Sequence, residues 1–207
     1  RLTKRIQIPT AEEVRATISA AEKAWRPLLA TAALSGLRAS ELRGLGWSHV
    51  DFAQKIIRVR RRADRWNKIG PPKSKSGLRD IPFGGNISLI LQRHAETCPR
   101  GDLDLVFPNG RGRVQPLSNI WRRGLAPAQK VAGIVDDQGQ AKFSLHAFRH
   151  FAASLFIASR KFSPKEIQVV IGHASIVETF DVYGHLFAKR DDISEVMGDI
   201  ESMVFEA

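Results

Sequence analysis

The stretch that decides the fold is SPKEIQVVIGHASIVETFDVYGH, residues 163–185. Its opening Ser-Pro-Lys-Glu is a capping-box pattern with proline in the first turn, which predicts a helix over 164–171. Gly172 should end that helix, because glycine suits the left-handed position past a helix end. A second helix should then run through 178–183. The stretch therefore predicts two short helices joined at a corner.

Groups suited to phosphate chemistry lie at this corner and at the end of the second helix. His173 follows the glycine where a helix should begin, and free N–H groups at helix starts favour anions, so its ring can donate to a phosphate oxygen. Tyr183 is the only tyrosine in the 207 residues. Gly184 should end the helix after it and leave its side chain room to move. A phenol with its ordinary pKa near 10 is a poor nucleophile at neutral pH, so a reactive Tyr183 needs nearby positive charge.

Upstream, His146-x-x-Arg149-His150 opens a predicted helix over 146–159. His146 and Arg149 are three apart and share a face, and a histidine beside an arginine at a helix start suits proton transfer at a phosphate. His146 and His150 also have a metal-ligand spacing. No glutamate lies between them, no cysteine is near and the carboxylates form no recognisable ligand pattern, so we expect no metal and no cofactor. For His150 we favour a core histidine satisfied by the backbone, supporting the site.

Further upstream, Ser35-Gly36-Leu37-Arg38-Ala39-Ser40-Glu41-Leu42 places an arginine just past the predicted end of a helix over 25–34. Arg38 offers a planar fork of donors that matches two phosphate oxygens at once. Glu41 lies three residues on, in a predicted short helix over 39–44, and could orient Arg38. The alternative interpretation is a plain Arg–Glu pair on a helix.

The remaining pattern predicts a mainly α fold with one small antiparallel β-sheet, an α+β class. Further helices are expected over 11–21, 87–96, 117–131 and 190–204. Strands over 56–60 and 79–83 should pair with each other. We expect a single domain, with its core at about 10–189.

The chain carries a formal net charge of +11, which indicates a polyanionic partner, nucleic acid first. Residues 55–80 hold ten Lys or Arg against two acids and surround the predicted strand pair. We expect this region to contact DNA phosphates, and a merely solvated basic face is the alternative. The candidate DNA-binding residues are Arg58, Arg60, Arg61, Arg62, Arg65, Lys68, Lys75 and Arg79.

The single cysteine, Cys98, excludes an internal disulfide and a cysteine-rich metal site, which fits a reducing cytoplasm. No run of 18 apolar residues and no signal peptide is present, so no membrane association is expected. Because the chain starts at Arg1, we expect a fragment that begins at a domain boundary.

Taken together, these boxes resemble the tyrosine recombinase family of the phage-integrase type, over about residues 10–189. The resemblance implies the catalytic domain of a DNA breaking-and-rejoining enzyme. It implies that Tyr183 attacks the DNA and forms a 3′-phosphotyrosine link, that Arg38 and Arg149 hold the non-bridging oxygens, that His146 assists proton transfer and that His173 donates to the phosphate. The family also has a hairpin lysine that protonates the leaving 5′-oxygen. We assign it to Lys73, from its distance ahead of Ile81-Pro82, with Lys75 as the alternative.

The resemblance also implies double-stranded DNA as partner, a monomer when free and a synaptic tetramer on DNA. Family members carry a helical core-binding domain ahead of the catalytic one, which we expect to be absent from this fragment. Residues 191–207 hold six acids and no base. The helix over 190–204 has an apolar stripe that needs a partner surface; we expect it to dock on a neighbouring protomer, and its own core is the alternative. The resemblance favours a mobile-element integrase. The alternatives are a type IB topoisomerase-like enzyme and a catalytically silent DNA-binding module.

Overall fold

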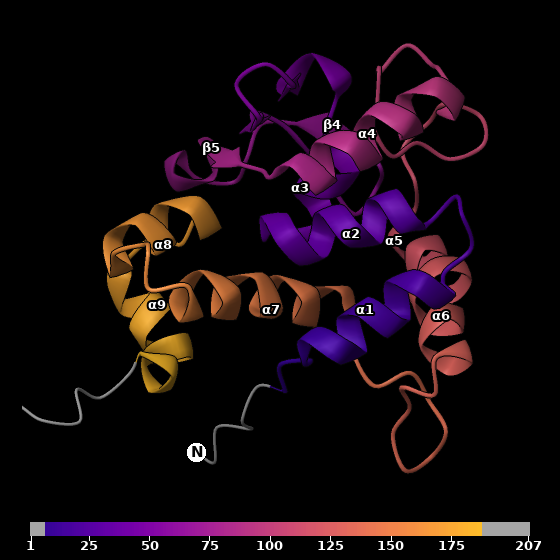
Figure 1. Cartoon of the computed structure of the whole chain (residues 1–207). Helices are drawn as coiled ribbons and strands as arrows, with labels where there is room; N and C mark the ends of the chain where they lie inside the picture. Colours follow the sequence, from indigo (N-terminus) through magenta and orange to yellow (C-terminus); the bar gives the residue numbers. More distant parts are fainter. Residues whose placement is uncertain (1–6, 188–207) are drawn as a thin grey trace, which may run out of the picture.

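The computed structural model describes residues 7–187 and shows a mainly helical fold with two small antiparallel sheets. The longest helices are α7 (Leu145–Ala158) and α4 (Gly85–Thr97). In Figure 1, α7 and α2 run side by side through the middle of the molecule, the strands lie on one side of this pair, and α8 and α9 close one end of α7. The other helices are α1 (Ala11–Ala20), α2 (Arg26–Ser35), α3 (Ala39–Gly44), α5 (Leu117–Asn119), α6 (Ala126–Val131), α8 (Pro164–Ile171) and α9 (Ile176–Tyr183).

The main core forms where α2 packs against α7. Seven of the ten residues of α2 are buried, because its sequence is apolar on nearly every side. Phe148 and Phe151 of α7 belong to the same cluster, which also takes in Leu42 of α3. Burial of this many large apolar side chains is the main source of stability for such a fold.

The three-stranded sheet has the order β1–β2–β5, with β1 (Val50–Asp51), β2 (Ile56–Val59) and β5 (Arg79–Pro82). Ile57 pairs with Ile81, and both are fully buried. The predicted pairing of residues 56–60 with 79–83 is thereby confirmed. Strand β1 and the small hairpin of β3 (Arg62–Ala63) and β4 (Ile69–Gly70) were not predicted, because two-residue strands carry too little alternation to recognise.

The helix expected over 117–131 is interrupted. Between α5 and α6 the chain forms a π-helical segment at Ile120–Leu125, where each turn holds one more residue than in an α-helix. Gly124 in this segment packs on Trp25, and an added Cβ would lie 2.8 Å from the indole ring. The chain is thus helical over the predicted range 117–131, and only the π-helical segment in the middle was not predicted.

The helix ends largely follow the predicted signals. Thr10 and Ser163 each accept a hydrogen bond from the backbone of the glutamate three residues on, and that glutamate bonds back, as the capping-box pattern predicts. The helix predicted over 190–204 lies outside the described residues. Within residues 7–187, no helix is both long and apolar enough to cross a membrane.

Candidate active site

Two glycine corners organise the site. Gly36 ends α2 with φ +65° and Gly172 ends α8 with φ +78°, a region of backbone space that favours glycine. The Gly36 carbonyl accepts a hydrogen bond from Nη1 of Arg149 at 2.6 Å, and the Gly172 carbonyl accepts one from Nη2 of Arg38 at 2.6 Å. The corners thus fix both arginines that the sequence nominated for phosphate binding.

Glu41, which is 3% exposed, lies at the centre of a network with two arginines. Its carboxylate accepts from the backbone N–H of Arg38 at 2.8 Å and from Nη1 of Arg38 at 3.0 Å. It also accepts from both terminal nitrogens of Arg79, at 3.0 and 2.8 Å. Burial alone would raise the pKa of Glu41, but the hydrogen bonds and charges of Arg79 and Arg38 outweigh it and hold the pKa below its ordinary value. The carboxylate therefore stays charged and orients Arg38, as predicted.

Arg79 is not a surface residue. Its side chain is 1% exposed, and Nε donates to the Val170 carbonyl at 2.7 Å in addition to the contacts with Glu41. The expectation that Arg79 contacts DNA is wrong. Alternation along β5 could have revealed this, since Arg79 and Ile81 share the buried face of the strand.

Arg149 is 3% exposed and makes no ion pair with any carboxylate among residues 7–187. Burial, followed by the positive charges of Arg38 and Arg79, lowers the pKa of Arg149 to about 9. A buried guanidinium in this setting carries an electrostatic cost that a bound anion would remove. The arrangement therefore favours phosphate binding between Arg38 and Arg149.

Two histidines contact the phenol of Tyr183, and a third lies beside one of them. Nδ1 of His150 lies 2.7 Å from the Tyr183 hydroxyl, and the His173 ring stacks on the Tyr183 ring with centroids 6.0 Å apart and planes within 4°. The ring of His146, which is exposed, lies edge-on to His150 with centroids 4.5 Å apart. Helices α7, α8 and α9 thus bring together the residues that the sequence placed in two separate boxes.

Burial and positive neighbours keep these histidines neutral. Burial, with the charges of His146 and Arg149, lowers the pKa of His150 to about 4. Burial and Arg149 likewise lower the pKa of His173 to about 4, and its Nδ1 lies 3.0 Å from the Thr179 hydroxyl. His146 is exposed at one side only, and the desolvation of the rest of its ring, followed by the charges of Arg149 and Arg38, also lowers its pKa. Neutral rings can donate one hydrogen bond and accept one proton each.

Two expectations are wrong here: the free room around the Tyr183 side chain and the backbone partner of His150. Tyr183 is fully buried, packed among Ile157, Ile167 and Ile171, so its side chain has no free room in this structure. Burial raises its pKa to about 12, and the lowering effect of Arg149 does not compensate. His150 was expected to be satisfied by the backbone, but its partner is the Tyr183 hydroxyl. No sequence signal distinguishes these partners, because α7 and α9 meet only in the folded chain.

Lys73 and Lys75 are both exposed on the loop between β4 and β5. Their assignment to the proton-donating role stays a prediction. The other basic candidates fall into two groups. The guanidinium groups of Arg58, Arg60 and Arg61 bond to Asp51, to Asp80 and to two backbone carbonyls, respectively. Arg65 and Lys68 are exposed near the tip of the β3–β4 hairpin, and Arg62 is half-buried at its base.

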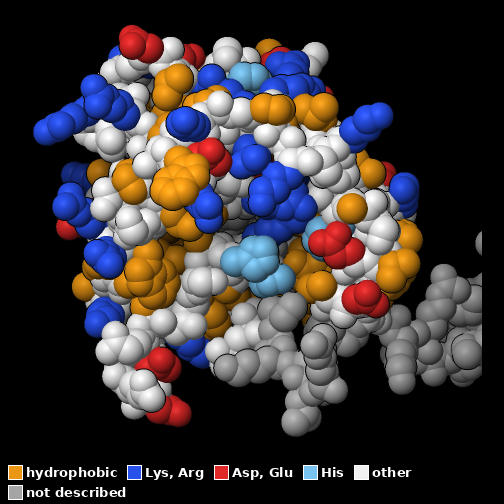
Figure 2. All heavy atoms as spheres, turned by 180° about the vertical axis from the view of Figure 1, so that it is seen from behind, with side chains coloured by type: hydrophobic (Ala, Val, Ile, Leu, Met, Phe, Trp, Pro, Cys, Tyr) orange, Lys and Arg blue, Asp and Glu red, His pale blue; other side chains and the backbone are white. Residues whose placement is uncertain are grey.

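One face of the molecule combines these features. Figure 2 shows histidine side chains near the middle of this face, with lysine and arginine side chains directly above them and acidic groups to one side. Residues 7–187 contain no cluster of His, Cys, Asp or Glu that could hold a metal ion. The site is thus a positively charged surface with a buried phenol beneath it.

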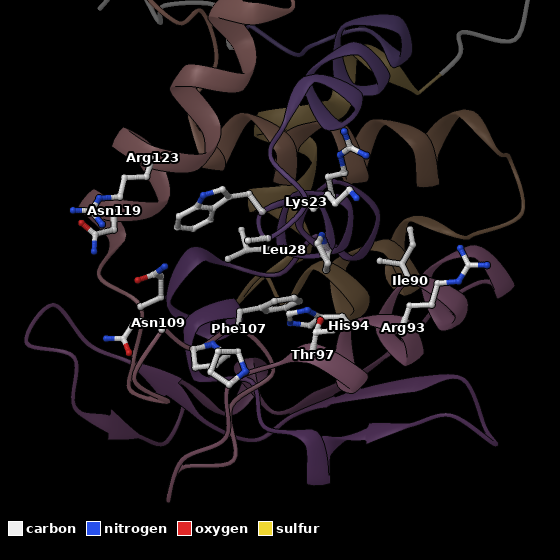
Figure 3. Close-up of a pocket in the computed structure, with 18 residues that line it drawn as sticks. Lys23, Leu28, Ile90, Arg93, His94, Thr97, Phe107, Asn109, Asn119 and Arg123 are labelled. Atoms are coloured by element: carbon white, nitrogen blue, oxygen red, sulfur yellow. The ribbon is translucent and has the colours of Figure 1, made fainter.

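A separate cavity of about 970 Å³ lies at the other end of α2 (Figure 3). Leu28, Ile90 and Phe107 form apolar parts of its wall, and Lys23, Arg93 and Arg123 lie around them. None of the candidate catalytic residues lines it. The candidate site is therefore not this pocket, which fits a substrate that lies across the surface elsewhere.

Comparison with known proteins places the chain in a family. The family model described as "Phage integrase family" matches residues 8–190. A tyrosine recombinase XerC-like protein of Caldanaerobacter subterraneus subsp. tengcongensis is 27% identical over 192 residues, covering 80% of this chain and 47% of the relative. The ICEBs1 integrase of Bacillus subtilis is 24% identical, covering 85% of this chain and 49% of the relative. The chain spans about half the length of these curated relatives.

Solved structures show the same fold. The Tn1549 transposon integrase in complex with a circular intermediate DNA has a TM-score of 0.72 at 21% identity, covering 98% of this chain and 67% of that one. XerA recombinase has a TM-score of 0.71 at 22% identity, covering 98% of this chain and 65% of that one. The family match over nearly the whole chain, together with the arginine, histidine and tyrosine boxes, shows that the chain belongs to the phage integrase family.

Proposed function

We propose that the chain is the catalytic domain of a site-specific DNA recombinase that cleaves and rejoins double-stranded DNA through a covalent 3′-phosphotyrosine intermediate. The observation that carries the proposal is the buried Arg149, without a carboxylate partner within residues 7–187, next to Arg38 and above the only tyrosine. The integrases and recombinases among the relatives, and the DNA in the solved neighbour complexes, support it.

The proposed chemistry is a transesterification. The Tyr183 oxygen forms a bond to phosphorus, and the bond from phosphorus to the 5′-oxygen breaks. Arg38 and Arg149 stabilise the negative charge that develops on the non-bridging oxygens, as fixed donors do in other phosphoryl-transfer sites. His173 donates a hydrogen bond to the phosphate, His146 assists with the phenol proton, and Lys73 gives its proton to the 5′-oxygen. The phosphotyrosine ester conserves the energy of the broken bond, so rejoining needs no ATP.

The buried phenol sets a condition on this reaction. A fully buried hydroxyl bonded to His150 cannot reach a phosphate on an external duplex, so Tyr183 must first leave that hydrogen bond. Helix α9 ends at Tyr183, and a short 3-10 turn begins at Gly184, which provides a place where the backbone can change direction. We therefore propose that DNA engagement includes a movement of the end of α9.

The test is covalent trapping. Duplexes of random sequence, nicked so that the cleaved strand is lost, are incubated with the wild-type chain, with Tyr183→Phe and with the surface control Arg15→Ala. We expect a denaturant-resistant adduct with wild type and Arg15→Ala, but none with Tyr183→Phe, in the presence of a metal chelator. Sequencing the trapped DNA then begins to define the target. Absence of an adduct, with salt-sensitive DNA binding intact, would mean either that a core-binding domain is required or that the chain is a silent binding module. Trapping with a protein that carries both domains decides between these two outcomes.

A type IB topoisomerase-like activity uses the same chemistry and is the second candidate. Exchange of strands between two duplexes supports a recombinase, while relaxation of a supercoiled plasmid without exchange supports the topoisomerase.

We propose further that the active assembly is a tetramer on two DNA sites, formed from a protein that is monomeric when free. In this proposal a helical core-binding domain completes a clamp around the duplex, and the acidic segment 190–207 docks on a neighbouring protomer. The 207-residue chain alone should then bind its site more weakly than a protein that carries both halves of the clamp. Equal affinity of the two for the trapped sequence would contradict this.

A further inference from the structure

We propose that Arg79 is a positioning residue, which fixes the lysine-bearing loop between β4 and β5 relative to the two phosphate-binding arginines. The inference rests on the proposed function. Arg79 was expected on the DNA surface, and its burial instead places a guanidinium among three parts of the site. It bonds Glu41 in α3, the Val170 carbonyl in α8 and the Gly77 carbonyl at the end of the loop.

The first contact ties down the loop. Nη1 of Arg79 donates to the Gly77 carbonyl at 3.2 Å. Gly77 is itself held by a backbone bond to Ser74 at 3.0 Å, and it packs so closely on Pro72 that an added Cβ would lie 2.5 Å from the proline ring. Lys73 and Lys75 lie between these points, so the position of the Gly77 carbonyl limits where their side chains can reach.

The second contact joins the loop to the phosphate-binding arginines. Glu41 accepts two hydrogen bonds from Arg79 and two from Arg38, so one carboxylate aligns both guanidinium groups. On the other side, the Arg79 guanidinium lies against Gly172, where an added Cβ would be 2.8 Å from Nη1. The Gly172 carbonyl in turn accepts from Arg38, and His173 follows in the chain. Arg79 therefore contacts both segments that orient Arg38.

The chemistry of arginine suits this position. A planar fork can bond both oxygens of one carboxylate and still reach two carbonyls, whereas a lysine ammonium offers three donors from a single point. All the partners are buried or half-buried, so lost bonds would not be replaced freely by water. Substitution should therefore loosen the loop while Arg38 keeps its own bonds to Glu41 and Gly172.

The step that depends on the loop is protonation of the leaving group. In the proposed cleavage, the Tyr183 oxygen bonds to phosphorus, the 5′-oxygen departs with the electron pair of the broken bond, and the lysine ammonium supplies its proton. A general acid must lie within hydrogen-bonding reach of that oxygen. In a duplex with sulfur in place of the bridging 5′-oxygen, the leaving group is a stable thiolate. It needs no proton, because thiols are far more acidic than alcohols.

The experiment compares these two leaving groups on the duplex selected by trapping. Cleavage rates are measured for wild type, Arg79→Met, Arg79→Lys, Lys73→Ala and Lys75→Ala. We expect Arg79→Met to slow cleavage of the oxygen substrate on the order of 100-fold, which is the range for loss of a general acid. Cleavage of the sulfur substrate should slow by less than about tenfold. Arg79→Lys should fall between. One of the two lysine variants should also cleave the oxygen substrate slowly and the sulfur substrate almost normally. Adding Arg79→Met to that variant should reduce its cleavage rate on the oxygen substrate little further.

Several outcomes would overturn the inference. Equal losses on both substrates in a folded Arg79→Lys would mean that Arg79 acts only through Arg38 or through general stability. No loss in Arg79→Met would mean that the loop needs no such anchor. Circular-dichroism melting identifies variants that do not fold. If Arg79→Met does not fold, the comparison of the two substrates is made with Arg79→Lys. Absence of a Tyr183-dependent adduct in wild type on both substrates is a separate result, which overturns the proposed function itself.

Discussion

At the scale of single residues, Arg149 carries an electrostatic cost that the proposed phosphate binding would offset. Its guanidinium is buried near Arg38 and Arg79, and among residues 7–187 its only hydrogen-bond acceptor is the Gly36 carbonyl. Glu41, which could have neutralised it, is instead engaged by Arg38 and Arg79. The charge of Arg149 is therefore largely uncompensated by the residues that the structure describes.

This predicts an unusual substitution. Arg149→Met removes a buried, unpaired charge but keeps the volume, so the free energy of unfolding should rise by about 1 kcal/mol while adduct formation is lost. Arg79→Met breaks a buried ion pair and should lower the free energy of unfolding by about 3 kcal/mol. Urea denaturation of the two variants measures both values. A loss of stability in Arg149→Met as large as that in Arg79→Met would show that Arg149 is compensated in the free protein.

At the scale of elements, the corner after α8 combines a left-handed backbone with close packing. Gly172 has φ +78° and touches the Arg79 guanidinium, whereas Gly133 has φ +72° and open space, with no atom within 4 Å of where a Cβ would lie. The two glycines thus share a backbone conformation and differ in their surroundings.

Alanine substitution at Gly133 and at Gly172 separates backbone strain from a steric clash of the added Cβ. Gly133→Ala should lower the free energy of unfolding by about 1 kcal/mol, the cost of a left-handed alanine. Gly172→Ala should cost at least about 2 kcal/mol and also reduce adduct formation, because its Cβ displaces Arg79. Thermal melts and the trapping assay give the two readouts. Similar effects of the two substitutions would mean that Arg79 moves aside without consequence.

The hairpin tip offers a second prediction at this scale. Arg65 and Lys68 are exposed, while the Arg60 guanidinium bonds Asp80 at 2.6 Å. If the tip contacts phosphates, Arg65→Ala and Lys68→Ala should each reduce the slope of log binding constant against log salt by about 0.9. Arg60→Ala should change the slope less, because its charge is already paired. Equal slopes for all three variants and wild type would place the DNA elsewhere.

At the scale of the whole molecule, the neutral histidines link stability to pH. An ordinary histidine titrates at a pH of about 6.5, but burial lowers the pKa of His150 and of His173 to about 4 in the folded chain. As the pH falls from 6.5 towards 4, the unfolded chain takes up protons that the folded chain does not. The free energy of unfolding should therefore decrease over this window.

The matched variant is His150→Gln, which can still bond the phenol but cannot titrate. Its free energy of unfolding should fall less steeply with decreasing pH than that of wild type. The two slopes should differ by up to about 1.4 kcal/mol per pH unit, the value for one proton. Chemical denaturation from neutral pH down to the folded-state pKa of about 4 measures the difference. Identical slopes would show that His150 titrates normally in the folded chain.

Local patterns in the sequence predicted only part of this arrangement. Boxes of residues three or four apart predicted the Arg38–Glu41 pair and the helix carrying His146 and Arg149, because such contacts are local. Alternation along β5 indicates that Arg79 points inward. The partners of Arg79 and His150 lie 38 and 33 residues away along the chain, and no local pattern encodes them. The burial of Tyr183 belongs to the same class, since α7 and α8 supply its surroundings.

The solitary phenol has a practical consequence for watching the enzyme at work. Because no other residue of its type exists among the 207, a fluorinated tyrosine supplied during expression would mark one place only. The chemical shift of a fluorine nucleus on Tyr183 would report whether its ring is stacked on His173 or exposed to water. Titrating such a labelled chain with duplex DNA would count the enclosed and released populations directly, before any strand is cut.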